Sequence, residues 1–414
     1  MPENSTFSGH DDSLSKSSQQ ALTNSDSEKG PWKARVVLGN AVKRPFALLP
    51  KRKNRKLPKG TPKRIAFFHY GDYEVAFKFF VEHVVDAEYV KLPPATKRTL
   101  ELGSAHSTDF VCAPYKHILG TYIEALERGA NVLVQFAGPC RLGYYGELQE
   151  AELRSMGYEF EMMNFSSLDG LAPLPYLEEA KKKLNPDLKL KSAVPNAVAA
   201  FKLLEHLDEM RDFYLANAGF EIEKGAFDRT LDDIHARFSQ CTNGREIRKV
   251  YLDGMKELRA IPIDKPANPL RVGIVGEVFT AVDPFSNLFT EKKLLSMGVE
   301  VHRTVNLTNR WLHYNEENLR TSITDYCDYD MGPTSSLTIA TAKKYAQLGF
   351  DGILHLKSSG CTPEIDVMPT LQRISRDYGV PMLFLSFDSQ TSDTGLDTRL
   401  EAFYDMIARK RTIA

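Results

Sequence analysis

Residues 131–150, "NVLVQFAGPCRLGYYGELQE", contain an apolar run, a turn and the beginning of a helix. The run 131–136 predicts a buried strand. A Gly-Pro pair breaks the run just before Cys140, and a helical pattern follows Gly146. A strand that leads through a turn into a helix is typical of a parallel α/β sheet, whose ligands bind at the carboxyl ends of the strands.

The same alternation surrounds this stretch. Short apolar runs predict strands, and apolar residues at helical spacing predict helices. The predicted strands are 65–68, 87–92 and 158–165, and the predicted helices are 74–84 and 113–130. Together they indicate one parallel sheet with helices on its faces.

A second α/β unit is expected near the end of the chain. Its predicted strands are 271–277, 352–356 and 380–388, and its predicted helices are 283–301, 335–350, 363–379 and 396–410. The first of these helices is expected to have Asp283 as its N-cap, Pro284 at its first position and Gly298 at its end. Between the two units the charged and apolar spacing is helical.

The chain therefore divides into four predicted parts. These are a polar and basic tail (1–60), a first α/β unit (61–170), a mainly helical connector (171–267) and a second α/β unit (268–414). The basic run 51–64 fits either a contact with an acidic partner or a solvated linker, and we prefer the linker.

Composition excludes some classes of protein. The 414 residues suffice for two or three domains, and a net charge of −1 gives no whole-molecule argument for nucleic acid or membrane binding. No apolar run approaches the roughly 20 residues of a membrane span. The N-terminus lacks the apolar core of a secretory signal, so we expect a cytoplasmic protein.

Three of the five cysteines occupy similar settings. Cys140 and Cys361 follow predicted strands, and Cys112 precedes a predicted helix, with Gly or Pro close to each. A helix N-terminus favours a thiolate, whereas an isolated free cysteine is more often a small buried hydrophobic residue. We expect Cys241 to be structural and keep Cys327 as a candidate fourth ligand.

Dispersed thiols suggest a metal. No Cys-x-x-Cys pair of the zinc type and no ferredoxin-type cysteine run occurs in the sequence. Three separate thiolates suit a 4Fe–4S cluster with one iron open to a substrate oxygen, and zinc remains an alternative.

At residues 112–149, 276–287 and 360–403 the chain resembles the 2-hydroxyacyl-CoA dehydratase superfamily, and more closely its acyl-CoA dehydratase activase-related (CoA protein activase) branch. The resemblance covers about 64–165 and 268–408. It implies two flavodoxin-like units flanking a cleft, and a 4Fe–4S cluster held there by Cys112, Cys140 and Cys361. It also implies a separate ATP-hydrolysing activase as electron donor.

Because the chain has no Walker-type loop, it would receive the electron rather than hydrolyse ATP. Two segments depart from the family pattern. Lys357 and two serines precede Cys361, and the loop 331–336 reads "MGPTSS". Both departures put the substrate in question more than the cluster.

Several other residues have both a functional and a structural interpretation. Glu277 ends a predicted strand and fits either an acid/base group or a helix cap. Arg141 fits the binding of an anionic ligand or cofactor, or a surface ion pair. For Tyr144 and Tyr145 packing is preferred to lining the cleft. His69 and His355 are expected to be structural.

The leading hypothesis is an iron–sulfur electron-transfer protein of anaerobic metabolism, acting as a lyase or reductase component on a CoA thioester. The alternatives are a non-catalytic scaffold and a metabolite-binding α/β protein with structural zinc. Homodimers and heterodimers both remain open.

Overall fold

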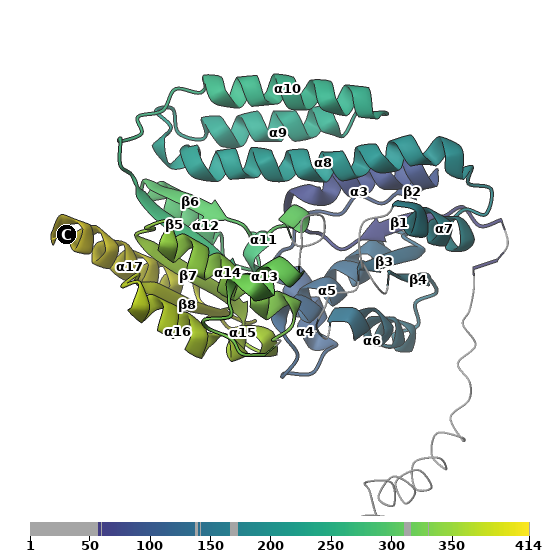
Figure 1. Cartoon of the computed structure of the whole chain (residues 1–414). Coiled ribbons are helices and arrows are strands. Elements are labelled where there is room, and N and C mark those ends of the chain that lie inside the picture. Colours follow the sequence, from purple (N-terminus) through teal and green to yellow (C-terminus); the bar gives the residue numbers. More distant parts are fainter. Residues whose placement is uncertain are drawn as a thin grey trace, which may run out of the picture. The chain divides into compact units, whose positions relative to one another are not determined.

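The structure is a computed structural model that describes residues 57–58, 60–136, 140, 142–165, 173–309, 316–329 and 331–413. The predicted tail falls almost wholly outside these residues, as does Arg141. Residues 55–414 form one compact unit. Its described part contains two four-stranded, all-parallel sheets with helices packed on them, which confirms the predicted α/β class (Figure 1).

The first sheet has the strand order β2-β1-β3-β4. Its strands are β1 (Arg64–Phe67), β2 (Glu88–Tyr89), β3 (Val132–Phe136) and β4 (Glu161–Phe165). The helical segments among them are η1 (Gly71–Tyr73), α3 (Glu74–Phe80), η2 (Val81–Val85), α4 (Lys97–Ala105), α5 (Ala113–Glu127) and α6 (Leu142–Ser155). Strand β3 is buried along most of its length because it lies between β1 and β4.

Helices follow the first sheet. They are α7 (Pro173–Lys183), α8 (Leu190–Asn217), η3 (Ala218–Phe220), α9 (Ala226–Phe238) and α10 (Gly244–Ala260). Figure 1 shows α8, α9 and α10 lying side by side, and the long helix α8 contacts both α3 and β6. This helical layer therefore touches a helix of the first α/β unit and a strand of the second sheet.

The second sheet has the order β6-β5-β7-β8, so its first strand also lies between its second and third strands. Its strands are β5 (Leu270–Gly276), β6 (Val299–Arg303), β7 (Gly352–Ser358) and β8 (Met382–Phe387). Its helices are α11 (Val278–Val282), α12 (Thr290–Ser296), α13 (Glu316–Ser322), α14 (Pro333–Gln347), α15 (Thr362–Asp366), α16 (Met368–Asp377) and α17 (Asp393–Ile413).

The helix expected over 283–301 was wrong in its beginning and its length. Asp283 ends α11 and caps a turn, accepting a hydrogen bond from Ser286 N at 2.7 Å. Leu288 and Phe289 have φ values of 52° and 58°, which interrupt a right-handed helix. Helix α12 therefore begins only at Thr290.

Helices α4 and α5 touch through two glycines. A Cβ atom at Gly103 would lie 1.7 Å from the carbonyl oxygen of Lys116, and one at Gly120 would lie 1.8 Å from that of Thr99. No side chain fits at either position, so the two backbones are in direct contact. This contact fixes the axis of α5, the helix that begins directly after Cys112.

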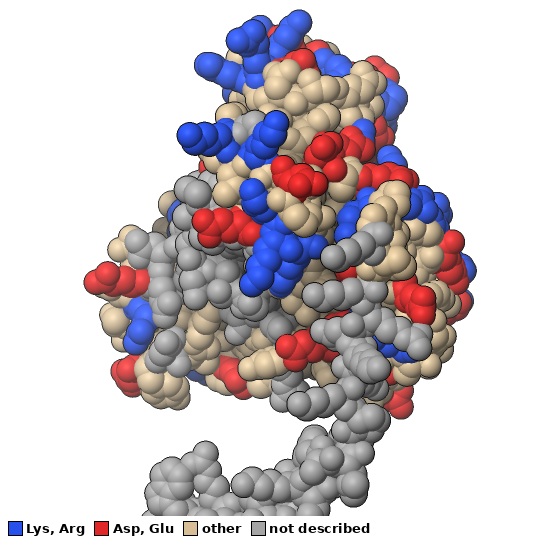
Figure 2. Space-filling model, turned by 90° about the vertical axis from the view of Figure 1, so that its right-hand side faces the viewer, with Lys and Arg blue, Asp and Glu red and all other residues tan. Residues whose placement is uncertain are grey.

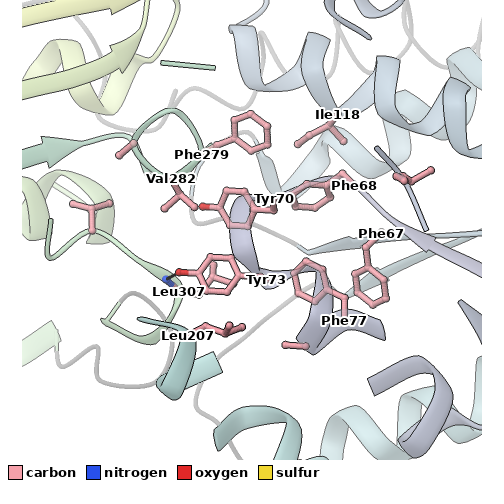
Figure 3. Close-up of a cluster of buried hydrophobic side chains, with 14 of the residues drawn as sticks. Phe67, Phe68, Tyr70, Tyr73, Phe77, Ile118, Leu207, Phe279, Val282 and Leu307 are labelled. Atoms are coloured by element: carbon pink, nitrogen blue, oxygen red, sulfur yellow. Dashed lines mark hydrogen bonds between the residues drawn. The ribbon is translucent and has the colours of Figure 1, made fainter. Parts of the chain in front are cut away.

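Aromatic side chains join the loop after β1 to α11 (Figure 3). Tyr70 stacks on Phe279 with ring centroids 5.4 Å apart, and its hydroxyl donates to Val278 O at 3.0 Å. Behind them Phe67 stacks on Phe77 at 4.7 Å. One continuous apolar core therefore includes side chains of both sheets.

A buried polar seam connects the same regions. Asp208 of α8 accepts hydrogen bonds from the hydroxyl of Tyr73 and, at 3.0 Å, from Thr308 N. The Tyr73 hydroxyl in turn accepts from Leu307 N at 3.1 Å. Nearby, Arg303 of β6 pairs with Glu291 of α12. Asp208 is thus hydrogen-bonded to residues of both halves of the structure.

Candidate functional site

Cys112 and Cys361 lie close together although 249 positions separate them in the sequence. Ala113 N, at the start of α5, donates to Ser358 Oγ, at the end of β7, at 2.8 Å. A Cβ atom at Gly360 would lie 3.5 Å from the Cα atom of Cys112. This is an ordinary van der Waals distance, so the two cysteine-bearing loops are in contact at Gly360.

Both cysteines are N-cap residues of helices that have proline in their first turn. Cys112 caps α5 and Cys361 caps α15. The N–H groups of a helix N-terminus are oriented toward such a side chain and favour negative charge there. This position agrees with the sequence-based expectation that these thiols precede helices.

Cys140 belongs to the same group of thiols. It lies between β3 and α6 and is partly buried. The charge of its thiolate contributes to raising the pKa of both Cys112 and Cys361. Cys140 is therefore near enough to affect the titration of Cys112 in the first α/β unit and of Cys361 in the second. The position of the neighbouring Arg141 lies outside the described residues, and its predicted role stays a prediction.

The thiols bind their protons tightly. Burial raises the pKa of Cys112 to about 11, although the hydroxyl of Tyr145, 2.7 Å from its sulfur, lowers it. Burial also raises the pKa of Cys361 well above its ordinary value, assisted by the charges of Glu277 and Glu364. In the absence of a metal cation both thiols are therefore neutral near pH 7.

A bound metal cation would instead favour the thiolate form of these cysteines, because a coordinating thiol loses its proton. The donor set fits an iron–sulfur cluster in kind: three thiols, helix N-termini and a hydroxyl donor to sulfur. Among the described residues, no three His, Cys, Asp or Glu side chains form a group that could hold a metal ion. The structure thus brings the loops of Cys112 and Cys361 into contact, while the described side chains do not form a complete site for one ion.

Glu277 is a buried helix cap. Its carboxylate accepts hydrogen bonds from Phe279 N at 2.8 Å, Thr280 N at 2.8 Å and Thr280 Oγ1 at 2.7 Å. Burial raises its pKa, and these hydrogen bonds oppose the rise. Both oxygens are occupied by α11, which favours the capping interpretation, and a catalytic role for Glu277 stays a prediction.

A second buried carboxylate lies beneath Cys361. Glu364, in the first turn of α15, accepts from Thr338 Oγ1 at 2.9 Å and pairs with His355 Nε2 at 2.7 Å. Lys357, also buried, has its pKa lowered by burial, while the charges of Cys361 and Glu364 oppose this. His355 thus has the structural setting expected of it.

Sequence reasoning missed Glu364 and undervalued Tyr145. Tyr144 is 69% exposed and Tyr145 is 5% exposed, so the two adjacent tyrosines have different environments. The position of Glu364, three residues after Cys361 at the start of a helix, was a usable signal.

The remaining cysteines have other neighbours. Cys241 is buried and its sulfur lies 3.5 Å from Arg237 O, as expected for a structural residue. Cys327 lies 3.5 Å from the sulfur of Met331 and packs on a separate apolar cluster. Neither of these contacts of Cys327 involves Cys112, Cys140 or Cys361.

His117 gives this region a predictable response to pH. The residue is 4% exposed, and burial lowers its pKa to about 4. The unfolded chain takes up this proton near pH 6.5, so stability is lost as the pH falls from about 6.5 to about 4. In His117→Leu this loss should be smaller by about 2 kcal/mol at about pH 5.

Urea unfolding at about pH 8 and about pH 5 would measure how much unfolding free energy His117→Leu and the wild-type chain each lose between these pH values. Parallel pH profiles for the two proteins would contradict the assignment of this effect to His117.

A comparison with models of protein families gives a match in the second half of the chain. A family model described as 2-hydroxyglutaryl-CoA dehydratase, D-component, matches residues 214–407. This stretch holds Glu277, Glu364 and Cys361 and leaves out Cys112 and Cys140. No curated protein matches the chain. No helix in the described part of the chain is long and apolar enough to cross a membrane.

Proposed function

We propose that the chain, whose residues 214–407 match the model of the 2-hydroxyglutaryl-CoA dehydratase D-component, is an iron–sulfur component of the 2-hydroxyacyl-CoA dehydratase type. Cys112, Cys140 and Cys361 would hold a 4Fe–4S cluster in a reduced, cytoplasmic setting. A separate ATP-hydrolysing activase would be the electron donor, and dehydration or reduction of a CoA thioester would be the reaction. The acyl-CoA dehydratase activase-related branch remains our proposed placement.

One observation carries the proposal: the loop of Cys112 and the loop of Cys361 meet where α5 begins and β7 ends. The hydrogen bond from Ala113 N to Ser358 Oγ and the approach of Gly360 to Cys112 hold the two loops together. Such a cluster, when bound, supplies one-electron chemistry whose potential depends on charge and on hydrogen bonds to sulfur.

The surrounding side chains suit the tuning of such a group. Tyr145 can donate its hydroxyl hydrogen to the sulfur of Cys112 once that sulfur is a thiolate. Lys357 contributes a positive charge and Glu277 a negative charge near Cys361. Burial of Cys361 limits the access of water to this side of the site.

Metal analysis of the anaerobically purified protein tests the proposal. About four irons and four sulfides per chain are expected. Cys140→Ser and Cys361→Ser should each lose most of both, because each removes a thiolate ligand. Cys241→Ser is the matched control, since its sulfur lies against a helix carbonyl in the helical layer, and it should keep its iron.

Zinc without iron would instead support the alternative of a metabolite-binding or scaffold protein with a structural metal. Iron retained in both Cys140→Ser and Cys361→Ser would reject these residues as ligands. If the cluster is present, reduction by an activase with ATP, followed by electron paramagnetic resonance, tests the electron-transfer step.

A further inference from the structure

A cavity of about 520 Å³ lies where the loop after β1, the segment after α11 and helix α9 meet. Its wall includes His69, Asp232, His235 and Asp283, and none of the three grouped cysteines lines it. This volume is within the range of small-molecule sites. The cavity is therefore a second candidate site, separate from the thiols.

Asp283, which lines this cavity, has one buried side-chain oxygen without a hydrogen-bond partner. The residue is 1% exposed; its Oδ1 accepts from Ser286 N at 2.7 Å, and its Oδ2 has no hydrogen-bond partner. The nearest cationic candidate, His69 Nε2, lies 4.0 Å away, which is beyond hydrogen-bond distance. A buried carboxylate oxygen without a donor is costly, so a donor from a ligand would be stabilising.

His69 does not supply the missing charge. Burial lowers its pKa to about 4, with Asp72 opposing the shift, so the imidazole is neutral near pH 7. Burial likewise raises the pKa of Asp283 to about 7, and hydrogen bonds from Ser286 and Phe285 oppose that rise. A positively charged ligand would favour the ionised form of Asp283.

Most charges on the wall of the cavity already have partners. Three acidic side chains of the wall form ion pairs with basic side chains of the wall: Asp72 with Arg211, Glu74 with Lys91, and Asp228 with Lys292. Asp232 and Asp283 have no lysine or arginine partner among the described residues. The uncompensated charge of the cavity is therefore negative, and this favours a cation over a neutral donor.

The backbone that leads into Asp283 is held rigidly. Val282 packs in the aromatic cluster with Tyr70 and Phe279 (Figure 3), and Asn287 donates to Thr280 O at 2.9 Å across the following turn. On the outer face drawn in Figure 2, by contrast, basic and acidic side chains are intermixed. The cavity thus offers a fixed carboxylate oxygen rather than a diffuse acidic surface.

We propose that this cavity binds a small organic molecule through an ammonium group, whose N–H bonds reach Asp283 Oδ2. The proposal goes beyond the thiol site and does not depend on it. Its ligand class follows from the unpartnered carboxylate oxygen, the neutral imidazole beside it and the negative charge of the wall.

Calorimetric titration of the full chain with 1,4-diaminobutane tests this proposal, with 1,4-butanediol as the neutral analogue. The amine should bind saturably with a Kd of about 1 mM or tighter. The diol should not bind. This comparison uses the unaltered protein, so it does not depend on the folding of any variant.

Two variants locate the interaction. Asp283→Asn keeps the shape of the side chain and an acceptor for Ser286 N, and it should weaken amine binding about tenfold or more. Asp232→Asn removes an equal charge from the exposed rim and should weaken binding less than about threefold.

Equal binding of amine and diol, equal losses in the two variants, or no saturable amine binding would each overturn the proposal. Iron content is measured separately, so failure of this site and failure of the thiol site remain distinguishable.

Discussion

Replacing Gly120 by alanine is expected to lower the free energy of unfolding by about 3 kcal/mol or more. The new Cβ atom would lie 1.8 Å from the carbonyl oxygen of Thr99. A backbone atom cannot rotate away as a flexible side chain can, so α4 and α5 would have to separate. Equilibrium unfolding in urea measures the effect.

Gly395→Ala is the matched control, because Gly395 is also helical and a Cβ atom there meets nothing within 4 Å. This variant should be neutral or more stable by up to about 1 kcal/mol. Helix α5 begins after Cys112, so Gly120→Ala should also lower the content of the iron that we propose Cys112 helps to bind. Equal stability of the two variants would show that the contact between α4 and α5 can relax freely.

Arg303→Met is expected to lower the free energy of unfolding by about 3–5 kcal/mol. Arg303 is 6% exposed and donates to Glu291 and, at 2.6 Å, to Val305 O. Burial alone would lower the pKa of Arg303, but Glu291 raises it far above the ordinary value. Methionine fills much of the same volume yet leaves the carboxylate of Glu291 buried without its partner.

The double variant Arg303→Met, Glu291→Gln separates the effect of the unpaired Glu291 carboxylate from the effect of lost packing. Removing the stranded charge should recover part of the stability, as a double-mutant cycle measures. Arg229→Met tests an exposed pair with Glu223 and should cost less than about 1 kcal/mol. A similar cost for Arg229→Met and Arg303→Met would contradict the argument from burial.

The parallel sheets could be predicted because their strands are short apolar runs that alternate with helical patterns. Helix α4 could not be predicted in the same way. It packs through Thr99 and Gly103, which are its buried residues, so it has no apolar stripe. The interruption before α12 was also hidden, because leucine and phenylalanine rarely adopt positive φ.

Only the local features of the candidate site could be predicted from the sequence. Cys112 and Cys361 could be placed at helix starts from the neighbouring Gly and Pro residues. Their meeting depends on Ser358 and Gly360 contacting a segment about 250 residues away, which no local pattern reports. For Glu277, only the coordinates show that both carboxylate oxygens are occupied by a helix.

The shared strand order of the two sheets has a consequence for how the molecule could have arisen and how it must assemble. His69 follows the first strand of one sheet, and Asp283 follows the first strand and short helix of the other. Cys140 and Cys361 follow the third strands. Topologically equivalent positions thus contribute to each candidate site, as in an internally duplicated protein whose halves have diverged. Neither half contains all the residues of either candidate site, so binding of the proposed ligand or cluster would report that the two halves have docked.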